Sequence, residues 1–164
     1  MRGLWLILLV LISCKQNENH YAITILDQNE IQLENLQKLD LEGKNLLIGY
    51  LYAYGNECQN TSTSSKCQIL NSLDVEDECD EAHLYNLRNW FSEVILIKYK
   101  LNDCPALPFD HATQNSFEKI VIERHSDNLS ITYRIKGVNE SQEKNWNLEQ
   151  TDQYLIDRGV FEKI

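Results

Sequence analysis

Residues 118–136 read EKIVIERHSDNLSITYRIK, and this stretch decides the fold. The polar segment His125-Ser126-Asp127-Asn128 separates two runs that are rich in β-branched residues. Apolar side chains of the second run alternate and so share one side of a strand: Leu129, Ile131, Tyr133 and Ile135. The pattern predicts a β-hairpin in which Glu118–Arg124 pairs with Leu129–Lys136, and therefore an antiparallel sheet.

Further strands are expected on either side of this hairpin. Tyr21–Leu26 and Val94–Leu101 are rich in β-branched or alternating residues. Leu46–Tyr54 is almost entirely apolar or aromatic, which predicts a strand buried on both faces at the centre of the sheet. In such a strand one face, either core or binding surface, would carry Tyr50, Tyr52 and Tyr54. The final segment, from Trp146 to Phe161, fits either a strand or a short helix that Thr151-Asp152 would cap.

Two helices are predicted from apolar residues at helical spacing. Asp27 or Asn29 would cap the first, which would end at Gly43 and bury Ile31, Leu33, Leu36 and Leu39. The second would pack through Leu84, Leu87 and Phe91. We therefore expect a single α+β domain over residues 21–164, with a largely antiparallel sheet of about five strands and two or three helices.

The N-terminus carries a separate signal. One cation, Arg2, precedes the apolar run Leu4–Ile12, which is far below the ~20 residues needed to span a bilayer. Leu11-Ile12-Ser13-Cys14 resembles the lipobox of bacterial lipoproteins. The resemblance implies that residues 1–13 are removed and that Cys14 is lipidated. Residues 14–20 would form a polar tether, and Lys15 after the cysteine implies anchoring in the outer membrane, facing the periplasm or the medium.

Charge limits the classes of partner. Once the signal and Arg2 are removed, 14 Lys and Arg stand against 25 Asp and Glu. This excess of negative charge disfavours nucleic acids and anionic lipid surfaces, and it favours a basic partner or a cation.

The four remaining cysteines, Cys58, Cys67, Cys79 and Cys104, suggest two disulfides in an exported protein. Of three connectivities we favour Cys58–Cys67, which closes a polar loop, and Cys79–Cys104. A helix that rises about 20 Å and a strand that returns about 26 Å would bring the last two cysteines together. A metal site at Cys79 and His83 is the alternative, although zinc would need two more ligands.

An acidic cluster precedes the second predicted helix, and its members are Asp74, Glu76, Asp77, Glu78, Asp80 and Glu81. Carboxylates are favourable at a helix N-terminus, which is one explanation for their position. The other is an acidic face for a cationic protein, in which the binding residues would be Asp77, Glu78, Asp80 and Glu81. The cluster lacks the spacing of a calcium loop, so no metal site is predicted here.

Two classes of function remain. The first is a lipid-anchored, non-enzymatic interaction module, of the inhibitor or immunity type, that binds a basic envelope or toxin protein. The second is an envelope hydrolase or metal-dependent enzyme that uses His111 with Asp110, or His83. Because no Gly-x-Ser-x-Gly elbow accompanies these residues, we favour the module and predict neither a catalytic residue nor a cofactor.

Overall fold

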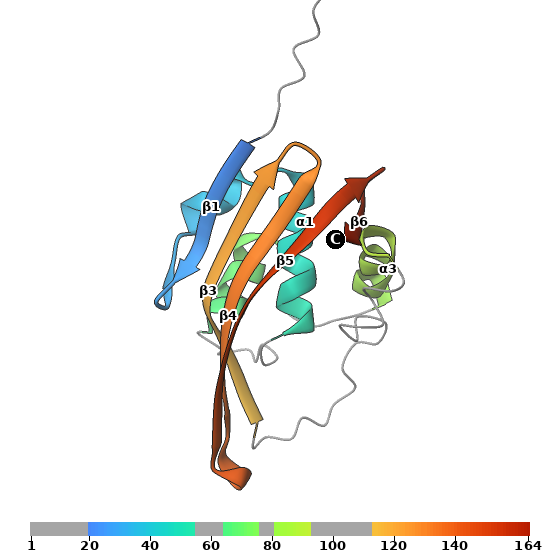
Figure 1. The fold of residues 1–164 in the computed structure, drawn as a ribbon. Coiled ribbons are helices and arrows are strands. Elements are labelled where there is room, and N and C mark those ends of the chain that lie inside the picture. The colour runs from blue at the N-terminus through green and yellow to red at the C-terminus, as the bar shows by residue number, and fades with distance from the viewer. Residues whose placement is uncertain (1–19, 55–63, 76–80, 93–112) are drawn as a thin grey trace, which may run out of the picture.

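The computed structural model describes residues 20–54, 64–75, 81–92 and 113–164. These residues form a six-stranded sheet in which every neighbouring pair of strands is antiparallel. The spatial order is β2-β1-β3-β4-β5-β6, with helices behind the sheet in the view of Figure 1. The strands are β1 (His20–Asp27), β2 (Glu30–Ile31), β3 (Thr113–His125), β4 (Asn128–Asn139), β5 (Lys144–Asp157) and β6 (Val160–Lys163). The α+β class with an antiparallel sheet is therefore confirmed.

The predicted hairpin is confirmed as β3 and β4. Arg124 lies opposite Leu129, and His125 lies opposite Asn128, so only two residues form the turn. The first of them, Ser126, has a positive φ of 58°, as the turns that match the twist of a hairpin require. Both strands are longer than predicted, and β3 contains an irregularity between Phe117 and Lys119.

The final segment is a strand, so the helical alternative is wrong. β4 continues to Asn139, the short 3-10 helix η2 (Glu140–Gln142) follows, and β5 returns along the whole of β4. Asn139 caps η2 by accepting a hydrogen bond from the backbone N–H of Gln142. Close packing explains the glycine in β4, since a Cβ atom on Gly137 would lie 1.9 Å from the ring of Trp146.

Leu46–Tyr54 does not form a central strand. Residues 46–53 belong to α1 (Leu41–Ala53), and Tyr54 is the C-cap of this helix. Asp40 caps its N-terminus by accepting a hydrogen bond from Gly43 N–H. Leu46, Leu47 and Leu51 are fully buried, because the helix is enclosed by the sheet on one side and by other helices elsewhere. A helix buried on most sides gives a continuous apolar run, which has the same sequence signature as a buried strand.

The first predicted helix is also corrected. Ile31 lies in β2, and the helical part of this segment is only the 3-10 helix η1 (Leu33–Lys38). Asn35 holds η1 against the sheet by donating from its side chain to the carbonyl oxygen of Thr24 at 2.8 Å. Gly43 does not end a helix but lies in the first turn of α1.

Two more helices complete the layer behind the sheet. α2 (Ser65–Ser72) was not predicted, whereas α3 (Glu81–Trp90) confirms the helix expected from the spacing of Leu87 and Phe91. Leu87 and Phe91 are 1% and 2% exposed, so the predicted apolar stripe does face the core. The predicted strand Val94–Leu101 lies outside the described residues.

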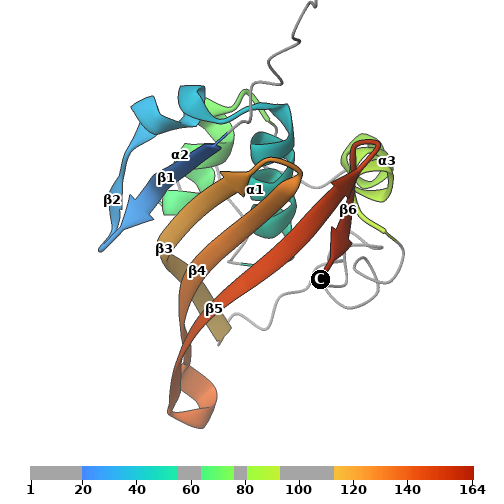
Figure 2. The same cartoon turned by 45° about the horizontal axis from the view of Figure 1, so that its top comes forward.

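The described elements form two layers around one core. Figure 2 shows α1 and α2 behind β1, β3 and β4, and α3 beside β6. Core side chains from both layers are fully buried, among them Leu46, Leu51, Ile69, Ile122 and Ile131. None of the described helices lies on the opposite side of the sheet, as antiparallel sheets permit. Within the described ranges, no helix has both the length and the apolar character to cross a bilayer.

Candidate functional site

Most residues proposed from sequence fall outside the described part of the chain. Glu81 and His83 lie in α3, but their side chains are not among those described. Cys67 lies in α2 and is 1% exposed. The other residues of these assignments lie outside the described ranges: Cys14, Cys58, Asp77, Glu78, Cys79, Asp80, Cys104, Asp110 and His111. Lipidation, the disulfides, the acidic binding residues and the enzymatic alternative therefore stay predictions.

A buried carboxylate is the first polar feature that sequence reasoning missed. Asp152 lies in β5 on the side that faces the helices and is 2% exposed. Its Oδ2 atom accepts a hydrogen bond from the Tyr50 hydroxyl at 2.5 Å, and its Oδ1 atom accepts one from Gln150 Nε2 at 2.6 Å. Lys163 of β6 forms an ion pair with Oδ1. Asp152 thus receives donors from α1, β5 and β6.

The hydroxyl groups around Asp152 form an ordered chain. Tyr50 has one hydroxyl proton, which it donates to Asp152, so the Tyr154 hydroxyl at 2.5 Å must donate to Tyr50. The pKa of Tyr50 is strongly raised. Burial of its hydroxyl is the largest cause, and the neighbouring Tyr154 and Asp152 raise it further. Because Tyr50 stays neutral, its hydroxyl can donate to Asp152 and so hold α1 against the sheet. This role is structural.

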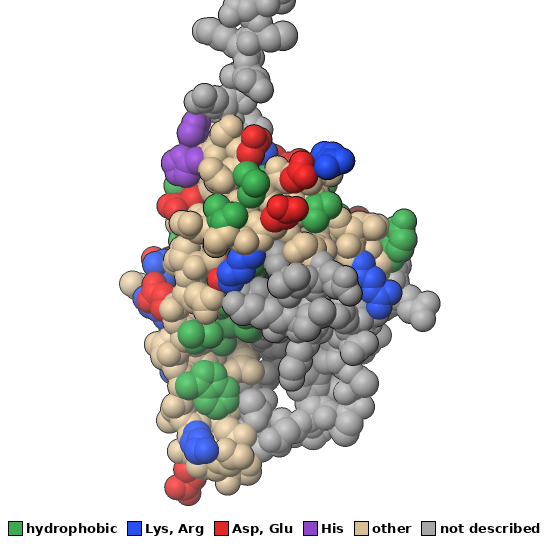
Figure 3. Space-filling view, turned by 45° about the vertical axis from the view of Figure 1, so that its right-hand side comes forward, with side chains coloured by type: hydrophobic (Ala, Val, Ile, Leu, Met, Phe, Trp, Pro, Cys, Tyr) green, Lys and Arg blue, Asp and Glu red, His purple; other side chains and the backbone are tan. Residues whose placement is uncertain are grey.

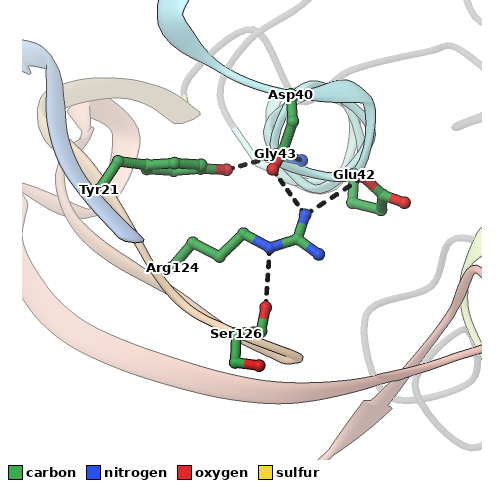
Figure 4. A network of polar contacts seen from close by, with 6 residues as sticks. All are labelled: Tyr21, Asp40, Glu42, Gly43, Arg124 and Ser126. Atoms are coloured by element: carbon green, nitrogen blue, oxygen red, sulfur yellow. Dashed lines mark hydrogen bonds and ion pairs between the residues drawn. The ribbon is translucent and has the colours of Figure 1, made fainter. Parts of the chain in front are cut away.

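A second polar network joins the other end of α1 to the sheet (Figure 4). Arg124 of β3 donates from Nη1 to Asp40 at 2.6 Å and to Glu42 at 3.2 Å, and from Nε to the Ser126 carbonyl oxygen at 2.8 Å. Tyr21 donates its hydroxyl proton to Asp40 at 2.8 Å. Desolvation, together with the Asp40 carboxylate, raises the pKa of Tyr21. Asp40 therefore caps α1 and links it to β1 and β3 at once.

The side of the sheet away from the helices is the strongest candidate for a binding surface, and we call it the open face. Its central part consists of three rows of side chains that cross the strands. The charged row is Asp27, Lys119, Arg134 and Glu149, in which each residue lies opposite the next on the neighbouring strand. Two bases at the centre are thus flanked by one acid on each side.

Ion pairs fix the charged row of the open face. Arg134 donates from Nη2 to Glu149 Oε2 at 2.6 Å, and Lys119 reaches Glu149 Oε1 at 3.3 Å. Hydrogen bonding to Arg134 and Lys119 lowers the pKa of Glu149 below its ordinary value. These ion pairs hold the charges of Lys119, Arg134 and Glu149 in a defined pattern on the surface of the sheet.

The other two rows of the open face consist of short side chains, apart from Glu123 and Gln153, and Glu123 is their one charged member. One row is Thr24, Val121, Thr132 and Thr151, and the other is Ala22, Glu123, Ser130 and Gln153. The hydroxyls of Thr132 and Thr151 lie 2.8 Å apart. Short side chains lose little rotamer freedom when they are covered, so a flat partner can bind here at low entropic cost.

Two histidines lie together at one end of the sheet, where the space-filling view shows them at the surface (Figure 3). They are His20, at the start of β1, and His125, at the end of β3, and both are exposed. Neither contacts the network around Asp152 or the one around Arg124 in any described hydrogen bond. Among the described residues, no group of three or more His, Cys, Asp or Glu side chains is arranged to hold a metal ion.

In the described ranges, the fold and the open face define a class: a two-layer α+β protein whose antiparallel sheet carries the described helices on one side and the open face on the other. Comparisons with protein-family models, with curated proteins and with solved structures found no match.

Proposed function

We propose that this protein is a lipid-anchored envelope protein that acts as a non-enzymatic interaction module, and that its open face binds the partner protein. The observation that carries the proposal is the arrangement of that face. Three cross-strand rows combine a fixed charge pattern with short side chains on four strands of one sheet. Rigid backbone under small side chains is suited to binding without a large ordering cost.

The anchor and the class of partner come from the sequence. Cys14 in its lipobox setting would carry acyl chains, and each buried methylene contributes ~0.8 kcal/mol to membrane attachment. The formal net charge of −10 favours a basic partner, since opposite charge speeds the encounter. An inhibitor or immunity protein against a cationic toxin has this combination of tether, charge and binding surface. Outer-membrane placement, facing the periplasm or the medium, is part of the same proposal.

Two further features are proposed from sequence. Disulfides Cys58–Cys67 and Cys79–Cys104 would each stabilise the domain by roughly 2 to 4 kcal/mol. The acidic residues Asp77, Glu78, Asp80 and Glu81 would form a second contact for a cationic partner, or would serve only to stabilise the start of α3.

A matched pair of charge variants tests the open face as the site of binding. The double variant Thr132→Arg and Gln153→Arg adds two positive charges to the open face. The control, Asn86→Arg and Asn89→Arg, adds the same charge to the exposed side of α3. Each lipidated protein is used to capture its partner from envelope extract, and the partner's affinity is then measured. We expect the first variant to weaken binding by about tenfold or more, or ~1.4 kcal/mol, and the control to retain it.

Equal loss in both variants would remove the open face from the proposal. The acidic cluster is tested in the same way by reversing the charges of Asp77, Glu78 and Asp80. Unchanged capture by that variant would leave those residues with a structural role only. Metabolic labelling with palmitate, in the native chain and in Cys14→Ala, tests the anchor separately.

A further inference from the structure

We propose that His20 and His125 form a binding site for one divalent copper ion at the end of the sheet. This site is independent of the interaction function proposed above. It needs only two side chains on adjacent strands, with water in the remaining positions of the ion. The strands place the two rings side by side, with their Nδ1 atoms 3.0 Å apart.

Strand pairing brings the two histidines together although 105 residues separate them in the sequence. His20 of β1 and His125 of β3 are direct cross-strand partners, and the strands are antiparallel. Directly opposed residues on one face of such a pair have Cβ atoms about 5 Å apart, so both side chains can reach one ligand between them. The sheet therefore holds both rings with no need for a long loop to close.

The Nδ1 atoms of His20 and His125 lie 3.0 Å apart, and the ring planes meet at 69°. Imidazole nitrogens bind transition metals at ~2.0–2.1 Å, so two nitrogens at this separation subtend an angle of ~95° at a shared ion. An angle near 90° is the angle between neighbouring ligands in a tetragonal or square-planar complex. Without metal, one of these nitrogens donates a hydrogen bond to the other. Copper binding would require the donor ring to carry its proton on Nε2 instead, and a small rotation of each ring would then turn both Nδ1 lone pairs toward the ion.

The number of protein ligands favours copper over zinc, because zinc takes at least three protein ligands in known site types. Divalent copper prefers tetragonal nitrogen and oxygen ligands, and it binds most strongly among the first-row divalent metals. Two neighbouring imidazoles and two waters satisfy that preference with the residues present. Because both histidines are exposed, an ion can enter from solvent without any rearrangement of the core.

The test is a titration of the full chain, purified in detergent, with copper(II) sulfate. Electron paramagnetic resonance reports how many nitrogens bind the ion, and calorimetry reports the affinity. We expect one tight copper ion with two imidazole nitrogens. Because losing one imidazole abolishes chelation, His20→Gln and His125→Gln should each weaken copper binding by about tenfold or more. Matched controls are His83→Gln and His111→Gln, the other histidines of the chain, which should change the affinity less than about twofold.

Thermal unfolding gives a second readout that also checks folding. Chelation by both rings requires β1 and β3 to be paired, so copper should bind the folded chain more tightly than the unfolded chain and raise the melting temperature of the native chain and of both controls. It should leave the melting temperatures of His20→Gln and His125→Gln unchanged, while all five proteins unfold at similar temperatures without metal. Equal copper affinity in native chain and His125→Gln, or a spectrum with one imidazole nitrogen, would overturn the proposal.

Discussion

At the scale of single residues, Asp152 has the most demanding environment in the described part of the chain. It lies opposite Ile131 on the core side of the sheet, yet it carries a carboxylate. A buried charge is tolerated when it is paired and fully hydrogen-bonded, and Lys163, Tyr50 and Gln150 meet that condition. Removing the Asp152 carboxylate leaves Tyr50, Gln150 and Lys163 without this acceptor.

We therefore expect Asp152→Ala to lower the free energy of unfolding by about 3 kcal/mol or more. The control is Asp157→Ala, since Asp157 belongs to the same strand and its side chain is 52% exposed. That substitution should change the free energy by less than about 0.5 kcal/mol. Urea denaturation measures both. Similar small losses in the two variants would show that the network around Asp152 contributes little.

Tyr50 gives a prediction about pH. Burial raises its pKa in the folded protein above the ordinary value of 10.0, so the folded state keeps the proton longer than the unfolded state does. The stability that this group contributes is fully present below roughly pH 10 and is lost as the pH rises further. Above that point one group of this kind lowers the free energy of unfolding by ~1.4 kcal/mol per pH unit.

The change that isolates this effect is Tyr50→Phe. We expect its free energy of unfolding to fall less steeply with alkaline pH than that of the native chain, even though its stability at neutral pH is lower. Denaturation series from roughly pH 9 to pH 11.5 give the two slopes. Parallel slopes would mean that Tyr50 ionises as easily in the folded protein as in the unfolded chain.

At the scale of elements, the sequence predicted those strands and helices that have one buried side. The hairpin of β3 and β4 was predicted from clean alternation, and α3 from helical spacing. α1 was misread because Leu46, Leu47 and Leu51 are buried on several sides of one helix, which removes the polar stripe. β5 stayed ambiguous because its first six residues are all exposed, Trp146 and Leu148 included, so the apolar side chains there do not mark a buried side.

Packing between helices explains why α1 contains Gly49. A Cβ atom there would lie 2.5 Å from the ring of Phe91, which is 2% exposed and cannot move aside. Alanine favours a helix by ~1 kcal/mol over glycine, but overpacking a core costs about 1–3 kcal/mol. We expect Gly49→Ala to lower the free energy of unfolding by up to about 2 kcal/mol, the difference between these two effects.

The matched test adds Phe91→Leu to Gly49→Ala in a double-mutant cycle. A smaller side chain at position 91 makes room for the new methyl group, so the two substitutions should couple favourably by about 0.5 kcal/mol or more. Denaturant unfolding of the four proteins gives the coupling energy. A Gly49→Ala protein that is more stable than the native chain would contradict the close contact between α1 and Phe91.

At the scale of the whole molecule, the candidate site is a product of long-range pairing, which explains why the sequence did not predict it. Arg124 and Asp40 are 84 residues apart, and Tyr50 and Asp152 are 102 residues apart. The charged row of the open face can be predicted only when the order of the four strands that contribute to it is known. The anchor and the net charge, in contrast, are local or compositional properties, and those were the parts of the functional hypothesis that the sequence could supply.

Site-specific photo-crosslinking in intact cells shows whether the partner protein binds the open face. A benzoylphenylalanine replaces Thr132 or Gln153 on the open face, and the same residue replaces Tyr85, which is 67% exposed in α3, as the control. The open-face interface predicts one adduct of the same mass from positions 132 and 153, and none from position 85. An adduct from position 85 alone would place the partner on the helical side and would contradict it.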